Sequence, residues 1–173
     1  MLALARHAIA AALAGAPAPQ VPDGPGARLL RGAFVTLEEQ RGGALRGCIG
    51  RVAGDRPLGD LIRSVAVAAA CDDPRFPAVV GDELAELRIE ISVLSEPTPL
   101  EPVDPGKLVI GRDGVLMRRG NVQGVLLPQV ATEHGWGPEE FLSAACRKAG
   151  VGPWAWREPG TQVFTFQADV FGE

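Results

Sequence analysis

Residues 87–93 alternate between apolar and polar side chains, and this pattern constrains the fold more than any other feature of the chain. The apolar positions are Leu87, Ile89, Ile91 and Val93, and the polar ones are Arg88, Glu90 and Ser92. Side chains of a β-strand point alternately to the two faces of its sheet, so the segment predicts a strand with one apolar face. Residues 161–171 alternate in the same way and predict a long strand that closes the sheet.

A hairpin is predicted nearer the N-terminus. Residues 33–37 (AFVTL) are rich in β-branched and aromatic side chains, which favour a strand. Gly42 and Gly43 can supply a turn, and residues 44–50 (ALRGCIG) then form the antiparallel partner. A two-residue turn would place Leu37 opposite Cys48 and Glu39 opposite Arg46, whereas a longer turn would shift this register.

Helical patterns are interleaved with these strands. They are expected at residues 2–14, 57–71, 128–135 and 138–149, with short strands at 107–110, 115–119 and 125–127. Because hairpins require antiparallel pairing, the pattern predicts an α+β fold with a largely antiparallel sheet flanked by helices. The glycine-rich phosphate-binding patterns of dinucleotide folds and P-loop proteins are absent.

Composition excludes several classes of protein. The 173 residues suit one domain, or two small lobes that share a core. The net charge of −4 argues against a general nucleic-acid binder. Three cysteines and two histidines, without metal-ligand spacing, argue against a disulfide scaffold or a zinc site and suit a reducing compartment. No apolar run reaches the roughly 20 residues that a membrane-spanning helix needs.

The run LRGCIG at residues 45–50 carries the clearest chemistry. Positions two apart in a strand share a face, so Arg46 and Cys48 are expected side by side. A guanidinium stabilises a thiolate, and the glycine between them, Gly47, often marks close approach of a ligand or another backbone. One interpretation is a nucleophilic or substrate-anchoring cysteine with an anion-binding arginine. The alternative is a small buried side chain packed against the arginine stem.

The run LRGCIG and five further ordered blocks resemble the AMMECR family, whose bacterial and archaeal members are called AmmeMemoRadiSam system protein A. LRGCIG is the hallmark. The blocks around it are GAFVTL at residues 32–37, DPRFP at 73–77, IEISVLS at 89–95, LLPQVATEHGW at 126–136 and FLSAACRKAG at 141–150. The resemblance covers nearly the whole chain. It carries no established activity with it, although the hallmark cysteine is suspected of catalysis.

The resemblance implies one AMMECR-type domain over residues 1–173, with a larger and a smaller lobe of undefined boundaries. It also implies a cytoplasmic location and association with a Memo-like protein and a radical S-adenosylmethionine protein. Neither association gives this chain an iron site or a cluster, so we expect no cofactor and no metal.

Three hypotheses follow. In the first, Cys48 and Arg46 are the catalytic residues of an enzyme acting on an unidentified anionic small molecule. Substrate-binding candidates are Thr36, Gly47, Arg75, Glu90 and Gln129, each in a family block. LRGCIG would lie at the mouth of a groove between the lobes, approached by the loops of Arg75 and Gln129.

In the second hypothesis, the chain is a non-catalytic substrate-binding or scaffold partner of the Memo-like and radical proteins. A nucleic-acid-modifying factor is the least favoured.

The N-terminal segment generates a first prediction. Leu2, Ile9 and Leu13 recur at helical spacing, so residues 2–14 should form an amphipathic helix that is retained, although a single arginine before an alanine-rich stretch resembles a signal peptide. Intact-mass analysis of protein expressed in its native host should find this segment present. A mature N-terminus near Pro19 would contradict the prediction.

Overall fold

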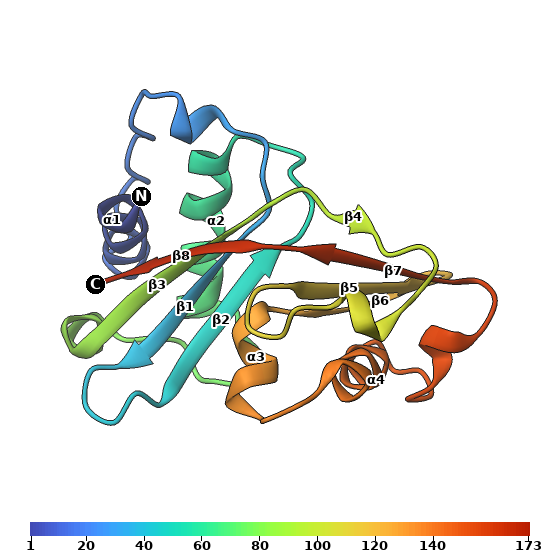
Figure 1. The fold of residues 1–173 in the computed structure, drawn as a ribbon. Helices are drawn as coiled ribbons and strands as arrows, with labels where there is room; N and C mark the ends of the chain where they lie inside the picture. The colour runs from blue at the N-terminus through green and yellow to red at the C-terminus, as the bar shows by residue number, and fades with distance from the viewer. The chain divides into compact units, whose positions relative to one another are not determined.

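The computed structural model describes residues 1–173, which form two compact units. The first unit comprises Met1–Leu94 and Asp169–Glu173, and the second comprises Ser95–Ala168. Each unit contains a four-stranded sheet and its own helices (Figure 1). The α+β class predicted from the sequence is confirmed, with two sheets in place of the single one expected.

The first sheet is built around a central antiparallel strand. Its strands in spatial order are β2 (Leu45–Arg51), β1 (Ala33–Glu39), β3 (Leu87–Leu94) and β8 (Ala168–Gly172). β1 pairs antiparallel with both β2 and β3, and β2 forms an edge of the sheet. The alternating segment at residues 87–93 is therefore a strand, as predicted.

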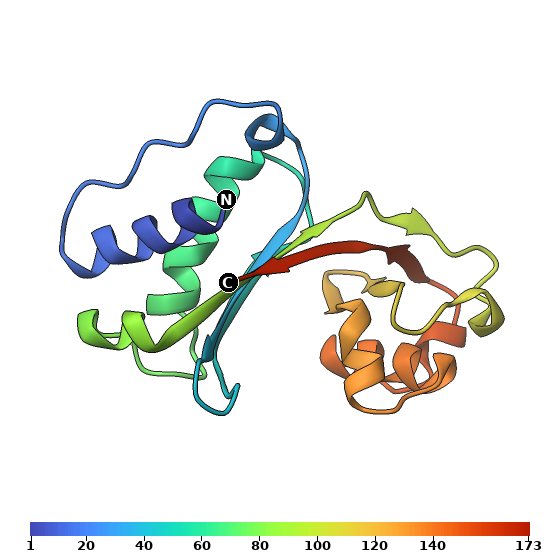
Figure 2. The same ribbon diagram turned by 60° about the vertical axis from the view of Figure 1, so that its left-hand side comes forward.

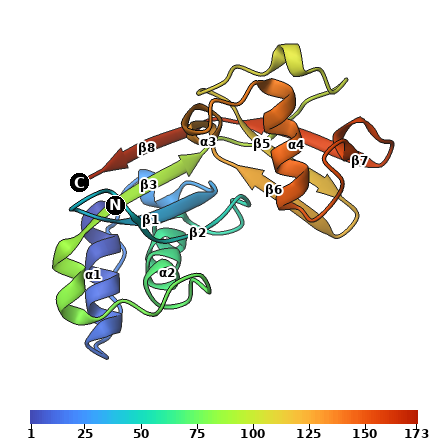
Figure 3. The ribbon, with the colours of Figure 1, turned by 90° about the horizontal axis from the view of Figure 1, so that it is seen from below.

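Two helices cover one face of this sheet, α1 (Leu2–Leu13) and α2 (Leu58–Cys71) (Figure 3). The apolar side chains of β1 and β3 pack beneath them in one buried cluster, which includes Val35, Leu37, Ile89 and Ile91. The N-terminal helix predicted from the sequence is confirmed. Because strand residues alternate, the polar residues of β1 and β3 lie on the face turned away from α1 and α2.

The Arg6 side chain links α1 by hydrogen bonds to the segments that this helix packs against. Its guanidinium donates to the carbonyl oxygens of Leu84 at 3.0 Å and Leu87 at 2.8 Å. Leu84 belongs to the 3-10 helix η2 (Gly81–Glu86), and a second one, η1 (Gly26–Arg28), follows the proline-rich connector. Arg6 also forms an ion pair with Glu173, which joins the first helix to the C-terminal strand segment.

The β1–β2 register differs from the two-residue-turn prediction, which is wrong. Thr36, and not Leu37, lies opposite Cys48. The turn is longer, since the amide of Glu39 bonds to the carbonyl of Ala44, and Gly42 and Gly43 both have positive φ. A β-bulge then skips Arg46, so Glu38 pairs with Leu45 and Leu37 with Gly47.

The second sheet contains a strand close to the predicted residues 115–119, a strand at 122–126 that begins three residues before the one predicted at 125–127, and a short strand at 98–99 that the sequence did not predict. Its spatial order is β4 (Thr98–Pro99), β7 (Thr161–Phe166), β5 (Gly114–Arg119) and β6 (Val122–Leu126). Helices α3 (Pro128–Glu133) and α4 (Pro138–Lys148) lie beside it (Figure 2). The apolar core of this unit is a single buried cluster that includes Met117, Phe141 and Trp156. Two 3-10 turns, η3 (Pro105–Lys107) and η4 (Ala155–Arg157), complete the unit.

Two predicted strands do not form as expected. Residues 107–110 form the end of η3 and the start of a turn, because the Asp113 carboxylate accepts the amide hydrogen of Val109 and Gly111 has a positive φ. The long strand expected at 161–171 is two strands, β7 and β8, in different sheets. The change of sheet occurs at Gln167, whose amide and carbonyl both bond to Ser95.

A glycine allows β2 to approach α2 closely. A Cβ atom on Gly47 would lie 2.1 Å from the carbonyl oxygen of Ala69 in α2, a distance that no real contact tolerates. The second unit repeats the arrangement, since a Cβ on Gly124 of β6 would lie 2.1 Å from the carbonyl oxygen of Ala145 in α4. In both units, a glycine in an edge strand has no side chain on the face that packs against a helix. The helix backbone can therefore approach the strand backbone closely.

We predict that Gly47→Ala destabilises the protein by about 1–3 kcal/mol, because α2 or β2 must shift to admit the methyl group. Gly81→Ala is the matched control, since a Cβ there meets no atom within 4 Å. Chemical denaturation of the two variants measures the difference. Equal stability of the two variants would show that the helix does not approach as closely as described.

Candidate functional site

Three polar side chains form a row across the first sheet. Thr36 on β1 lies opposite Cys48 on β2 and opposite Glu90 on β3. Directly paired residues of antiparallel strands point to the same face, so all three side chains lie on the face turned away from α1 and α2. We call Cys48, Thr36 and Glu90 the polar row. All three side chains are partly buried.

The Cys48 sulfur has a specific hydrogen-bond partner in this row. The hydroxyl of Thr36 donates to Cys48 Sγ across 3.3 Å. A hydroxyl that donates to sulfur stabilises the thiolate more than the thiol, because the charged form is the stronger acceptor. The sequence named both residues as candidates, and the observed register brings them together.

The backbone of Cys48 is held by the loop that follows α2. Asp73 Oδ2 accepts the Cys48 amide hydrogen at 2.9 Å, and Arg75 Nη2 donates to the Cys48 carbonyl oxygen at 3.2 Å. These are the backbone groups that an edge strand would otherwise leave without a partner. Two side chains of the DPRFP block therefore complete the hydrogen bonding of β2 at the cysteine itself.

Asp73 and Arg75 form a bidentate ion pair that changes both pKa values. Arg75 Nε and Nη2 donate to the two Asp73 oxygens at 2.9 and 2.7 Å. These bonds hold the pKa of Asp73 well below its usual range, and the amides of Cys48 and Arg75 lower it further. The Asp73 side chain is 2% exposed and that of Arg75 is 53% exposed, so the arginine reaches from a buried anion to solvent.

Arg75 is also the guanidinium that is electrostatically coupled to the cysteine. The bonds to Asp73 are the main reason that the pKa of Arg75 is raised, and the negative charge of the Cys48 thiolate adds to the effect. Such coupling is reciprocal, so the Arg75 charge favours the thiolate in turn.

Arg46 is bound to other groups. Its Nε and Nη2 donate to the carboxylate of Glu83, and its Nη1 donates to the carbonyl oxygen of Pro77 at 2.8 Å. The Arg46 bonds hold the pKa of Glu83 below its ordinary value. The sequence predicted that Arg46 would lie beside Cys48, but the bulge removes it from the regular pairing of β2 and its guanidinium bonds to the η2 region.

The remaining sequence candidates occupy different places. Gly47 is buried, and its bare side faces the Ala69 carbonyl of α2, so packing accounts for the glycine. Gln129 lies in the first turn of α3 in the second unit, where its carbonyl accepts the Thr132 hydroxyl at 2.7 Å. Its approach to Cys48, like the groove between lobes, stays a prediction. Burial raises the pKa of both other cysteines, Cys71 and Cys146.

Sequence reasoning missed two residues near the polar row. Asp73 could have been found from its place before a proline and two residues before Arg75, where a short acidic side chain commonly accepts nearby amides. Ser92, on the same face of β3 as Glu90, is 1% exposed and its hydroxyl has no hydrogen-bond partner. No pattern in the sequence distinguishes such a hydroxyl from a satisfied one.

No set of three or more histidine, cysteine, aspartate or glutamate side chains is arranged to hold a metal ion. None of the helices is both long enough and apolar enough to cross a lipid bilayer.

Comparison with known proteins decides the family. The family model for AMMECR1 matches residues 2–171. The chain belongs to the AMMECR1 family. A family relative from Methanothermobacter thermautotrophicus is 46% identical over 179 residues, covering 100% of this chain and 92% of the relative. Protein TK0174 of Thermococcus kodakarensis is 47% identical, covering 82% of this chain and 72% of that protein.

One solved structure is also similar to this chain. The crystal structure of the uncharacterized protein PH0010 from Pyrococcus horikoshii matches with a TM-score of 0.94 and 39% identity. The match covers 99% of this chain and 89% of that one. This similarity supports the same α+β fold.

We predict that Asp73→Asn destabilises the first unit by roughly 2–3 kcal/mol, because a buried amide and a guanidinium lose a charged acceptor. A carboxyl whose pKa is lowered by folding stabilises the protein above its unfolded-state pKa, near 3.8, and loses that effect as the pH falls further. The stability difference between wild type and variant should therefore be constant near neutrality and shrink below about pH 4.

The control for this prediction is Asp72→Asn, because Asp72 is the exposed neighbouring carboxylate. Urea unfolding at several pH values measures both variants. A difference that persists unchanged at pH 3, or an equal loss in the control, would contradict the role given to Asp73.

Proposed function

We propose that this AMMECR1-family protein is an enzyme in which the Cys48 thiolate attacks an anionic small molecule. The observation that carries the proposal is the hydrogen bond from the Thr36 hydroxyl to the Cys48 sulfur, in a residue whose carbonyl oxygen accepts a hydrogen bond from the Arg75 guanidinium. A cysteine that only fills space needs neither partner. The partly buried thiol and the half-exposed Arg75 side chain fit a nucleophile beside an anion-binding group.

Acyl transfer is the reaction class that requires no reactant besides the substrate, water and the cysteine. The Cys48 sulfur would form a bond to the acyl carbon, and the leaving group would depart with its electron pair and take up a proton. Water would then attack the thioester, releasing the acid and restoring the thiol. Every atom comes from substrate, water and the cysteine, so no oxidant or further co-reactant is required.

Glu90 is suited to the second step of this reaction. It lies on the other side of Thr36 from Cys48, two strand spacings or roughly 10 Å away along the row. That figure is the backbone spacing, and the reaction would require the Glu90 side chain to bring its carboxylate within hydrogen-bond reach of the water that attacks the thioester.

The alternative is a substrate-binding or scaffold protein without catalysis. A specific observation favours it: Arg46, Gly47 and the Cys48 backbone each have a structural partner, in Glu83, Ala69 and Asp73. In that case LRGCIG would be a packing motif, and the Memo-like and radical proteins implied by the family would supply the chemistry. The excess of acidic residues still disfavours a nucleic-acid partner.

The pH dependence of thiol alkylation tests the proposal. Iodoacetamide reacts with the thiolate, so peptide mass spectrometry after labelling reports each cysteine separately. In the native protein we expect Cys48 to react at lower pH than Cys71 and Cys146, whose pKa values are raised by burial. Arg75→Ala should move the Cys48 profile upward by about half a pH unit or more, since the arginine is half exposed and partly screened.

Matched variants separate the alternatives. Arg75→Lys keeps the positive charge and should retain most of the wild-type profile. Arg46→Ala should leave it nearly unchanged if Arg75 is the coupled group, whereas a larger shift in Arg46→Ala would support the pairing predicted from the sequence. If Cys48 reacts no faster than the other two cysteines, the enzyme proposal fails and the scaffold alternative is favoured.

A further inference from the structure

A polar cavity is lined entirely by residues of the second unit. Its volume is about 270 Å³. The polar side chains in its wall that bear on binding are Thr98, Thr165, Lys107, Arg112, Asp113 and Gln167. This volume is just below the range of pockets for drug-sized ligands, so the cavity suits a smaller group.

The Asp113 carboxylate holds the Arg112 guanidinium in place at the wall of this cavity. Its carboxylate accepts Arg112 Nε at 2.8 Å, Arg112 Nη2 at 2.9 Å and the Val109 amide at 2.9 Å. These bonds, together with one from the Gln167 side chain, hold the pKa of Asp113 below its ordinary value. The Asp113 side chain is 7% exposed and that of Arg112 is 55% exposed, so a buried anion fixes a guanidinium that still reaches solvent.

The cavity keeps one positive charge after this pairing. Lys107, at the end of η3, has no ion pair and its side chain is exposed. Arg112 bonds to Asp113 only through Nε and Nη2, so its Nη1 hydrogens have no protein acceptor. One aspartate therefore faces two cations, and the unbalanced charge attracts an anion.

Two hydroxyl donors lie close together in the same cavity. Thr98 on β4 and Thr165 on β7 are direct partners in the antiparallel pairing, so their side chains share one face. A lysine ammonium, free guanidinium hydrogens and two hydroxyls supply donors from several directions. A tetrahedral group with three equivalent oxygens uses such donors better than a planar carboxylate.

We infer that this cavity binds the phosphate group of a small phosphate monoester. The Lys107 ammonium would pair with the phosphate as a point charge, and the Nη1 side of Arg112 would bind a second oxygen. Thr98 and Thr165 would donate to the remaining oxygen. The inference is independent of the reaction proposed for Cys48.

Calorimetric titration of the full chain at low ionic strength tests the inference, with inorganic phosphate as the probe and acetate and chloride as competing anions. Wild type should bind one phosphate saturably, more tightly than either other anion. Lys107→Gln should weaken phosphate binding roughly tenfold, as expected for loss of a charge-assisted hydrogen bond. Thr165→Val should weaken it by a smaller factor while keeping a β-branched strand residue.

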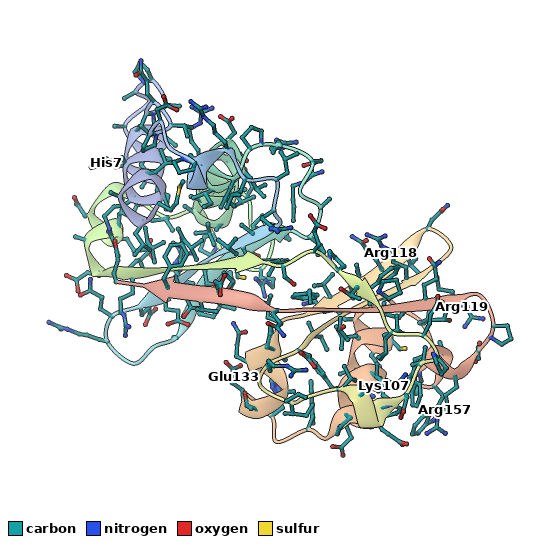
Figure 4. The ribbon with its side chains drawn as sticks, turned by 45° about the horizontal axis from the view of Figure 1, so that its top comes forward. His7, Lys107, Arg118, Arg119, Glu133 and Arg157 are labelled. Carbon is teal, nitrogen blue, oxygen red and sulfur yellow. The ribbon has the colours of Figure 1, made fainter.

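Arg118→Gln is the matched control, since it removes a positive charge from the same unit outside the cavity. The Arg118 guanidinium lies over the Phe164 ring, and Figure 4 shows Arg118 well separated from Lys107. The Arg118→Gln variant should bind phosphate with the same affinity as wild type. Absence of saturable binding, an equal loss in Arg118→Gln, or binding unaffected by Lys107→Gln would each overturn the inference. Tighter binding of acetate than phosphate would overturn the assigned ligand class.

Discussion

The carboxylate of Asp73 receives four hydrogen bonds, and the geometry of the first unit around Cys48 depends on them. One comes from the amide of an edge strand and three come from Arg75. A buried carboxylate without such donors would be protonated or would destabilise the fold, so the charge and its partners have to be present together. The loop after α2 is thereby fixed to β2 at one residue, and that residue is the cysteine.

The polar row follows from this attachment and from strand alternation. Gly47 lets α2 approach one side of β2, which leaves Cys48 on the other side. The register of β1 then places a hydroxyl against the sulfur, and the register of β3 places a carboxylate beyond it. Two of the three side chains come from strands whose other face is buried, so core packing fixes the register and hence the site.

The sequence predicts periodic features well and contacts between elements poorly. Alternation located β3, and helical spacing located α1 and α2, because each depends on a single segment. The bulge at Arg46 depends on the length of the preceding turn, and this arginine, which the strand pattern places beside Cys48, forms an ion pair with Glu83. The sequence marks Arg75 only as a candidate, because its hydrogen bond to the Cys48 carbonyl depends on where a distant loop packs. The sequence does not show the end of β7 for a similar reason. Gln167 continues the apolar–polar alternation of the strand, but its backbone amide bonds to Ser95 and not to a neighbouring strand of the second sheet.

The division of the last alternating segment into β7 and β8 has a consequence for the order in which the protein is completed. The first unit is discontinuous in sequence, because Asp169–Glu173 returns to it after the whole second unit. During synthesis, β8 and the Glu173 partner of Arg6 leave the ribosome after every residue of the second unit. The second unit can thus bury its core from contiguous chain, while the unit that carries Cys48 acquires its outer strand last. Until that strand arrives, β3 has an uncovered edge, and newly made chains are open there to pairing with one another.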